Sequence, residues 1–224
     1  MRSAELLACL LIAAPLAAQT AATQTPAAPS GWQWRLDTPG RIANAPNATA
    51  TDSTFRFENM APGWHVTMGP GGFLYDTAHT ASGRFAVQAE MILFPSSTND
   101  EFGLFIGGRD SGPGGESVTW FVVRRDGQAG VFAFSDGQMR PISDWAPREG
   151  IKPLAADGTA RTVVRVLAEP DSVRYFVDGN RVGAWPRAAL PVDGVYGFRI
   201  GRGTNMHITN LDITRRHAPY PARR

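Results

Sequence analysis

The sequence predicts an all-β protein built as an antiparallel sandwich or barrel. From Trp32 to Thr214, apolar and polar residues alternate with a period of two, as expected for strands with one buried face. Asp-Gly, a dipeptide suited to the positive φ angles of tight hairpin turns, occurs five times between such runs. Sustained 3.6-residue apolar repeats do not occur after residue 20, so we expect almost no helix.

The run from Phe85 to Phe94 shows the alternation most clearly. Its odd-numbered residues are all apolar and its even-numbered residues include Gln88 and Glu90, so one face is expected in the core. Alternating or β-rich runs predict seven further strands: Phe102 to Ile106, Val118 to Val123, Gly130 to Phe134, Thr162 to Leu167, Val173 to Val177, Val195 to Ile200 and His207 to Ile213. The Asp-Gly turns begin at Asp126, Asp136, Asp157, Asp178 and Asp193.

The first 18 residues are predicted to be a signal peptide. Arg2 precedes an apolar run from Leu6 to Ala18 that ends in small residues, which is the pattern of a secretory signal. This run would span only about 20 Å as a helix, too short for a hydrocarbon core of roughly 30 Å, so we expect no transmembrane anchor. Lipidation at Cys9 is disfavoured because largely apolar residues continue after it. We therefore predict an exported protein, periplasmic or secreted.

The rest of the chain divides into a leader, one folded domain and a tail. Residues 19–30 are uncharged, without aromatic residues and low in complexity, and are predicted to form a flexible leader. A single β-sandwich domain is predicted over residues 31–214. Residues 215–224 contain four Arg residues and are predicted to be a solvated basic tail. Cys9, the only cysteine, lies in the predicted signal peptide, so we expect no disulfide or thiol nucleophile in the mature protein.

The charge distribution argues against a nucleic-acid partner. The formal net charge is +2, and the four Arg residues of the tail leave the body of the domain mildly acidic, which suits a phosphate backbone poorly. Lys152, the only Lys, lies between Ile151 and Pro153, so the chain has no Walker-type phosphate loop. It also has no Gly-x-Ser-x-Gly motif and no Cys/His pair, which leaves hydrolysis through a nucleophilic Ser or Cys without support.

Several stretches taken together resemble concanavalin A-like jelly rolls. The segment from Ser172 to Val182, SVRYFVDGNRV, is similar to a hairpin near the end of those folds, and Gly194 to Thr214 resembles their final strands. The stretch from Asn99 to Gly108 is similar to the central strand of the bacterial 3-keto-disaccharide hydrolase domain, which is family 16 glycoside hydrolase-like. Gly63 to Pro70 resembles exported members of this group. The resemblance implies an antiparallel two-sheet jelly-roll β-sandwich with a concave face that often holds carbohydrate in relatives.

The catalytic signature of laminarinase-type relatives, Glu-x-Asp-x-x-Glu on one strand, is not reproduced. The nearest match, Glu169–Asp171, has Arg174 in place of the last Glu and contains a proline, so we interpret it as a hairpin corner. The best acid/base candidates are instead Glu90, on the longest predicted strand, and Glu101, which opens the next run and could meet it over the concave sheet. We favour the alternative that both are ordinary solvated positions on an outward face.

Aromatic and polar residues also predict a shallow carbohydrate site. Aromatic rings stack on the C–H faces of sugars, whereas His, Arg and amide groups hydrogen-bond the hydroxyls. The candidate ligand-binding residues are Trp64, His65, Gln88, Trp120, Arg124, Arg199 and His207. Trp64 and His65 are expected in or beside a loop because Gly and Pro flank them. A core position is the alternative for Trp120, and strand-surface charge is the alternative for the Arg residues.

A metal site is not predicted, because the four His residues show no ligand spacing. The loop from Arg109 to Glu116 offers carboxylate oxygens to Ca²⁺, although its Gly-rich sequence is more typical of a plain mobile loop. We therefore expect no cofactor, with Ca²⁺ as a weakly supported alternative.

The sequence as a whole predicts an exported, lectin-like domain that binds a carbohydrate or glycan-like ligand and lacks a recognisable catalytic motif. Two alternatives stay open. One is a glycoside hydrolase-type enzyme that uses Glu90 and Glu101. The other is an envelope domain that uses a sheet face as an interface for another protein.

Overall fold

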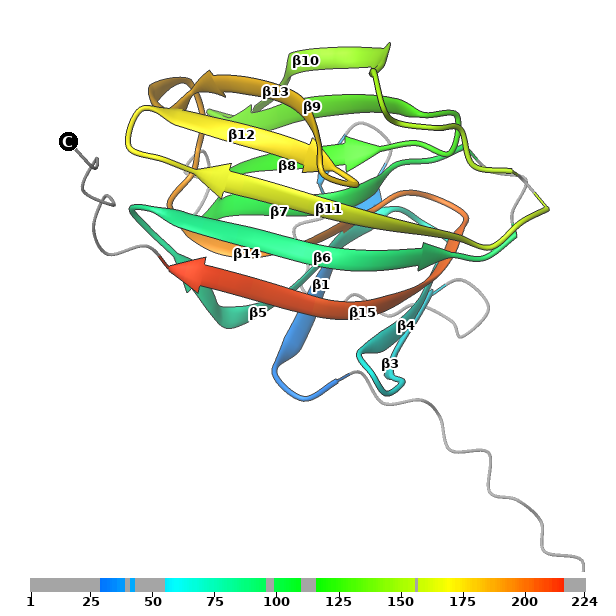
Figure 1. Cartoon of the computed structure of the whole chain (residues 1–224). Coiled ribbons are helices and arrows are strands. Elements are labelled where there is room, and N and C mark those ends of the chain that lie inside the picture. The colour runs from blue at the N-terminus through cyan, green and yellow to red at the C-terminus, as the bar shows by residue number, and fades with distance from the viewer. Residues whose placement is uncertain are drawn as a thin grey trace, which may run out of the picture.

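The computed structural model describes residues 29–38, 41–42, 55–95, 99–109, 116–155 and 157–215. The predicted signal peptide, most of the predicted leader and the tail beyond Arg215 lie outside these residues. Two antiparallel sheets form the described part of the chain (Figure 1), one of eight strands and one of seven. Its helical content is a single 3₁₀ turn at Arg187–Ala189, and no helix there is long and apolar enough to cross a membrane.

The eight-stranded sheet has the order β10-β9-β8-β7-β14-β5-β1-β2. Its strands are β1 (Trp32–Thr38), β2 (Arg41–Ile42), β5 (Gly72–Ala81), β7 (Phe102–Arg109), β8 (Ser117–Val123), β9 (Gln128–Ser135), β10 (Gln138–Pro147) and β14 (Gly194–Ile200). The seven-stranded sheet has the order β13-β12-β11-β6-β15-β4-β3. Its strands are β3 (Phe55–Asn59), β4 (Trp64–Met68), β6 (Phe85–Leu93), β11 (Ala160–Ala168), β12 (Ser172–Val177), β13 (Asn180–Pro186) and β15 (Thr204–Arg215). Each run predicted as a strand falls on one of these, so the all-β, two-sheet prediction is confirmed.

Two of the predicted Asp-Gly turns have the backbone conformation that their sequence favours. Asp136 and Gly137 have φ angles of 54° and 75°, and Asp178 and Gly179 have φ angles of 49° and 81°. Two successive positive φ angles characterise the type I′ turn, whose twist matches that of the strands it joins. These turns connect β9 to β10 and β12 to β13 as tight hairpins.

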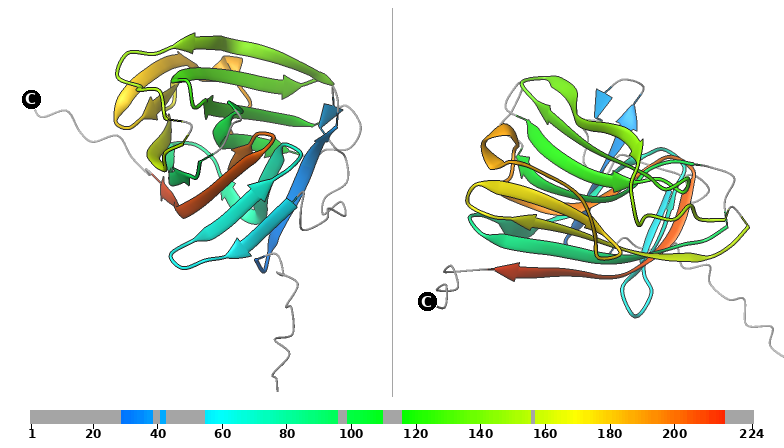
Figure 2. Two further views of the ribbon diagram at one scale, coloured as in Figure 1. Left: turned by 90° about the vertical axis from the view of Figure 1, so that its right-hand side faces the viewer. Right: turned by 45° about the horizontal axis from the view of Figure 1, so that its top comes forward.

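The main core lies between the two sheets, which stack as layers (Figure 2). The odd-numbered residues of β6 and the even-numbered residues from Phe102 to Ile106 in β7 are buried in it. Across this core, Phe121 of β8 faces Tyr175 of β12 with ring centroids 5.6 Å apart. The period-two pattern therefore sets which side of each strand enters the core.

A second apolar cluster lies on the opposite face of the eight-stranded sheet, which we call the outer face. Its buried members are Phe73, Phe105, Val118, Trp120, Val122 and Phe132. Along their strands these residues alternate with residues of the main core, so they point away from the seven-stranded sheet. The centre of the eight-stranded sheet is consequently apolar on both faces.

The segment that contains Trp64 and His65 is strand β4, which pairs with β3 and β15. Trp64 opens this strand directly after the bend at residues 61–63, so the pair lies beside a loop, as predicted, although both residues belong to the strand itself. Trp64 packs against the main core, with its ring centroid 5.0 Å from that of Trp32.

Candidate functional site

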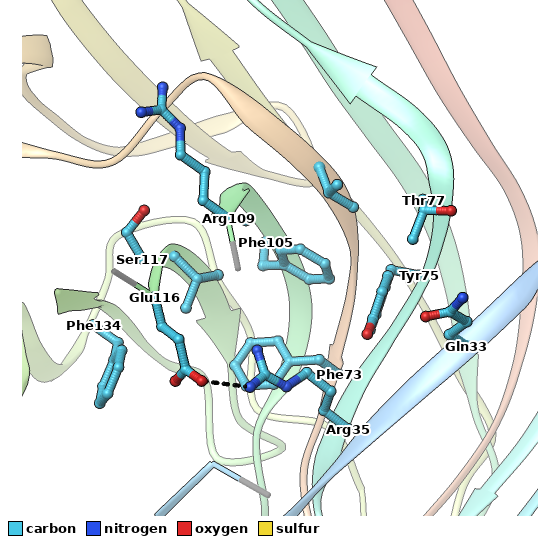
Figure 3. Close-up of a pocket in the computed structure, with 13 residues that line it drawn as sticks. Gln33, Arg35, Phe73, Tyr75, Thr77, Phe105, Arg109, Glu116, Ser117 and Phe134 are labelled. Atoms are coloured by element: carbon cyan, nitrogen blue, oxygen red, sulfur yellow. Dashed lines mark hydrogen bonds and ion pairs between the residues drawn. The ribbon is translucent and has the colours of Figure 1, made fainter. Parts of the chain in front are cut away.

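A pocket of about 200 Å³ opens on the outer face of the eight-stranded sheet (Figure 3). Its walls come from strands that are distant in sequence but adjacent in the sheet, because β14 pairs with both β5 and β7. The lining residues are Gln33, Arg35, Phe73, Tyr75, Thr77, Phe105, Gly108, Arg109, Glu116, Ser117, Val118, Phe134 and Val195.

One wall of the pocket follows from the register between β1 and β5. Gln33 lies opposite Tyr75, and Arg35 lies opposite Phe73. The intervening Trp and Leu residues of β1 pack in or against the main core. The alternation in the segment WQWRLD thus places an amide and a guanidinium beside aromatic rings on the outer face.

The floor of the pocket is aromatic. Phe73 and Phe105 pack edge to face with centroids 5.3 Å apart, and Tyr75 packs edge to face on Phe105 at 6.3 Å. Gly197 of β14 leaves room for this arrangement, because a Cβ atom there would lie 2.9 Å from the ring of Phe105. Phe73 and Phe105 are only 4% and 3% exposed, so the half-buried Tyr75 offers most of the ring surface on which a sugar can stack.

The aromatic packing continues from the pocket floor toward β10. Trp120 packs on Phe73 at 5.7 Å and on Phe132 at 5.8 Å, and Phe132 in turn contacts Trp145 at 5.3 Å. The guanidinium of Arg124 lies over the Trp145 ring, 3.7 Å from its centroid. Because only 6% of Trp120 is exposed, this row supports the floor from beside it and presents little surface of its own.

An ion pair forms part of the polar wall. Arg35 Nη2 lies 3.0 Å from Glu116 Oε1, and the two side chains are only 15% and 19% exposed. Figure 3 shows this pair beside Phe73, with Gln33 on the same strand as Arg35 and Tyr75 on the same strand as Phe73. Together these groups supply hydrogen-bond donors and acceptors to a ligand that rests on the floor.

A second charged network braces the same face of the sheet outside the pocket. Arg199 of β14 donates to both carboxylate oxygens of Asp37, at 2.8 and 2.6 Å, and to Glu101 Oε1 at 2.7 Å. Its guanidinium lies 4.8 Å from the centroid of the Phe73 ring. Burial alone lowers the pKa of Arg199, but the charges of Glu101 and Asp37 outweigh that effect and raise it. Arg199 is therefore a permanently charged support for β1 and Phe73.

Three of the predicted ligand-binding residues, Trp120, Arg124 and Arg199, lie on the outer face near the pocket. None of the three lines it. Trp120 is buried in the aromatic cluster, Arg124 covers Trp145, and Arg199 is engaged by two carboxylates.

The other four predicted ligand-binding residues lie elsewhere. Trp64 packs against the main core. His65, Gln88 and His207 alternate with core residues on β4, β6 and β15, so they point outward from the seven-stranded sheet. His207 lies opposite His65 in the sheet, and its Nε2 is 2.8 Å from the carbonyl oxygen of Pro62. The predicted residues therefore do not converge on one site.

Glu90 and Glu101 do not meet, which corrects the predicted acid/base pair. β6 and β7 belong to opposite sheets, so the chain crosses the sandwich between the two residues. Glu90 points outward from the seven-stranded sheet and pairs with Arg161, which lowers the pKa of the Glu90 carboxyl. Glu101 pairs with Arg199 on the other sheet. Each carboxylate thus has its own arginine partner.

Sequence reasoning missed the residues that line the pocket. Two local patterns in the sequence could have identified them. In β1, the polar residues Gln33 and Arg35 alternate with large apolar ones, which marks an outward polar row. In β7, Phe105 stands between Leu104 and Ile106, and such an uninterrupted apolar run is typical of a strand covered on both faces.

The pocket offers few groups for acid/base or metal chemistry. Among the lining residues that the structure describes, Glu116 is the one carboxylate, whereas most glycoside hydrolases use two carboxyl groups roughly 5–10 Å apart. The described residues contain no group of three or more His, Cys, Asp or Glu side chains placed to hold a metal ion. The predicted Ca²⁺ loop falls largely on residues 110–115, which lie outside the described part of the chain.

Comparison with known proteins gave matches to structures only; no family model and no curated protein matches this chain. The carbohydrate-binding module CBM66 from Bacillus subtilis matches with a TM-score of 0.55 and 12% identity, over 73% of this chain and 93% of the module. A glycoside hydrolase family 16 endo-glucanase from Bacteroides ovatus matches with a TM-score of 0.56 and 9% identity, over 82% of this chain and 94% of the enzyme. The exoplasmic/lumenal domain of VIP36, in a Ca²⁺/Man-bound form, matches with a TM-score of 0.52 and 9% identity, over 75% of this chain and 84% of that domain.

These likenesses establish the fold. The chain forms a concanavalin A-like jelly-roll sandwich, as the resemblance of its hairpin and final strands implied. Carbohydrate-binding and glycoside hydrolase proteins both use this fold, so fold alone does not choose between binding and catalysis.

Proposed function

We propose that this domain binds carbohydrate in the pocket on the outer face of the eight-stranded sheet. The observation that carries the proposal is the half-buried ring of Tyr75, backed by the buried Phe73 and Phe105, beside the polar wall of Gln33 and the Arg35–Glu116 pair. A sugar ring presents apolar C–H faces and polar hydroxyl edges, and this arrangement matches both. The fold shared with a carbohydrate-binding module adds support.

The size of the pocket limits what enters it. Its volume of about 200 Å³ is below the roughly 300–1,000 Å³ of pockets that enclose drug-sized ligands. We therefore expect one sugar unit of a glycan to occupy the pocket, with the rest of the glycan lying on the open sheet face.

A glycan-array screen of the purified protein tests the proposal, with Gln33→Ala and Tyr75→Ala as pocket variants. We expect each variant to lose at least about tenfold in affinity, because each removes a hydrogen-bonding or ring contact. Gln88→Ala is the matched control, since Gln88 is a half-buried Gln on the opposite sheet. A folded wild-type protein that binds no glycan would reject the proposal and favour an envelope interaction domain. Repeating the screen with excess chelator tests the Ca²⁺ alternative.

Hydrolysis is the second candidate, motivated by the likeness to the family 16 endo-glucanase and by Glu116 at the pocket wall. We expect no release of reducing ends from a bound glycan. If release occurs and Glu116→Gln abolishes it, the protein is an enzyme.

We also propose that the protein is exported, on the pattern of Arg2 and the apolar run from Leu6 to Ala18. Sequencing the N-terminus of the protein recovered from an expressing bacterium tests this. A mature chain that begins near Gln19 is expected, and an intact Met1 in the cytosolic fraction would contradict it.

A further inference from the structure

A second cavity, of about 520 Å³, adjoins the pocket at Arg109, which lines both. It lies where the ends of β5, β7 and β15 meet the start of β14. Three arginines line it from three parts of the chain: Arg84 just before β6, Arg109 at the end of β7 and Arg215 at the end of β15. Asp193 is the one carboxylate among the described residues that line it.

The carboxylate of Asp193 is already neutralised from outside the cavity. Its Oδ1 atom accepts a hydrogen bond from Arg187 Nη2 at 2.6 Å and another from the backbone N–H of Gly83 at 2.9 Å. Arg187 does not line the cavity. The lining therefore carries an excess of positive charge.

Two of the three arginines are oriented by neutral groups. Arg109 Nε donates to the backbone carbonyl of Asp193 at 2.9 Å, and Arg215 Nη2 donates to the carbonyl of Thr80 at 3.1 Å. Neither side chain forms an ion pair with a carboxylate of the described residues. A carbonyl fixes the direction of a guanidinium but leaves its charge and its remaining N–H groups free for a ligand.

Arg84 lines the cavity as the partner of Glu169, which does not line it. Its Nε and Nη2 atoms both lie 2.8 Å from Glu169 Oε2, which fixes the plane of the guanidinium. Its Nη1 atom is buried and has no hydrogen-bond partner among the described atoms. Because Nη1 is buried, a ligand in the cavity does not contact it, and the positive charge available to a ligand comes from Arg109 and Arg215.

We propose that this arginine-lined cavity binds an oxyanion, and that the ligand of the protein is an acidic glycan. Guanidinium groups are suited to planar and tetrahedral oxyanions, because their N–H groups form paired, charge-assisted hydrogen bonds. Arg109 connects the two cavities, so one sugar unit occupies the aromatic pocket while its carboxylate or sulfate substituent, or that of a neighbouring unit, enters the arginine cavity. The second part of the inference rests on the proposed carbohydrate function, whereas the anion site does not.

The test compares the affinity for oligosaccharides that share one backbone and are neutral, uronic acid-containing or sulfated. Wild type is compared with Arg215→Gln, which removes a charge from the arginine cavity without touching the pocket. Arg181→Gln, an exposed arginine on edge strand β13, controls for the loss of one positive charge. We expect wild type to prefer an acidic ligand by about tenfold or more, and Arg215→Gln to remove most of that preference with neutral binding unchanged. If Arg215→Gln loses more affinity for the uronic acid-containing ligand, the preferred anion is a carboxylate; if it loses more for the sulfated ligand, the preferred anion is a sulfate.

Two results would overturn the acidic-glycan inference while leaving the carbohydrate proposal intact. One is equal affinity of wild type for neutral and acidic ligands. The other is an equal loss of affinity for the acidic ligand in Arg215→Gln and Arg181→Gln. If no glycan binds, the carbohydrate proposal fails, and a thermal melt in sodium sulfate against sodium chloride at equal ionic strength decides the anion site alone. A sulfate-specific rise in Tm that Arg215→Gln reduces supports the anion site. Equal Tm values in the two salts would reject it.

Discussion

Arg199 links strand β14 to two other segments of the outer face. It joins β14 to Asp37 and to Glu101, and its own side chain is only 11% exposed. Replacing it by Gln leaves two carboxylates without their partner, and removing one member of a buried charge network is costly. Because Asp37 is 31% exposed and remains partly hydrated, we expect a loss of about 2–3 kcal/mol in the free energy of unfolding. Urea denaturation measures it, and a loss no larger than that of Arg181→Gln would contradict this role.

The hydroxyl of Tyr175 is buried in the core without a hydrogen-bond partner among the described atoms. The side chain is fully buried between the sheets. Burial accordingly raises the pKa of Tyr175. Because Tyr175→Phe removes the unpaired group and keeps the ring, we expect the free energy of unfolding to stay equal or rise by up to about 1 kcal/mol. A clear fall in the melting temperature would show that the hydroxyl makes a stabilising contact.

His65 is expected to make stability depend on pH. Burial is the main cause that lowers its pKa below the ordinary value of 6.5, with Arg56 and His207 acting in the same direction and Glu58 opposing them. The unfolded chain therefore binds a proton at a higher pH than the folded one, so stability is lost as the pH falls through about 6.5. Urea midpoints measured across this range should fall toward acid in wild type and fall less in His65→Gln. Identical slopes would exclude a contribution from His65.

At the scale of elements, replacing a glycine by alanine is expected to cost different amounts of stability in a turn and in a packed strand. Gly179 has a φ angle of 81° and nothing within 4 Å of an added Cβ, so Gly179→Ala costs only the backbone strain, about 1 kcal/mol. Gly197 lies between β5 and β7, where an added Cβ would be 2.3 Å from the carbonyl oxygen of Leu74. We expect Gly197→Ala to cost more than about 2 kcal/mol and to weaken glycan binding, because β14 must shift beneath Phe105. Urea denaturation and the glycan array check both variants, and equal costs would contradict this distinction.

Some strands could be predicted from the sequence and others could not. The strands β6, β7, β8 and β11 were predicted because their core-facing residues are strongly apolar. Strand β10 was missed, since it lies at an edge, is largely exposed and contains prolines at 141 and 147. Its pairing with β9 is interrupted by two register shifts between Pro141 and Ala146. Such irregular edges discourage pairing with other chains and leave no regular period in the sequence.

At the scale of the whole molecule, the strand order predicts slow folding. β14 pairs with β5 and β7, and β15 pairs with β4 and β6, so both sheets depend on contacts between distant parts of the chain. The entropy of closing long loops must be overcome before these contacts form, and all-β domains of this kind fold in milliseconds to seconds. Stopped-flow tryptophan fluorescence should therefore show refolding no faster than about a millisecond. Microsecond refolding would contradict this expectation.

The same strand order explains why the fold was predictable and the site was not. Alternation is a local property, and it correctly predicted eight of the fifteen described strands and the buried side of β6. Which outward side chains meet depends on the neighbours of a strand, and nothing local to Glu90 or Glu101 shows that they belong to different sheets. Trp64 and Tyr75 illustrate the limit: Trp64, an aromatic residue beside a glycine, was predicted to bind the ligand but packs against the main core, whereas Tyr75 lines the pocket.

The alternation of β1 and β5 has a further consequence for how this protein can change. Positions 33, 35, 73 and 75 form two facing cross-strand pairs on the outer face, while the residues between them hold the sandwich together. Gln33 and Tyr75, which are only partly buried, are therefore largely independent of the core. Under the proposed function, we expect substitutions there to alter ligand selectivity at little cost in stability. A library randomised at these two positions and selected on different glycans would test whether the specificity proposed for the pocket changes while the fold stays the same.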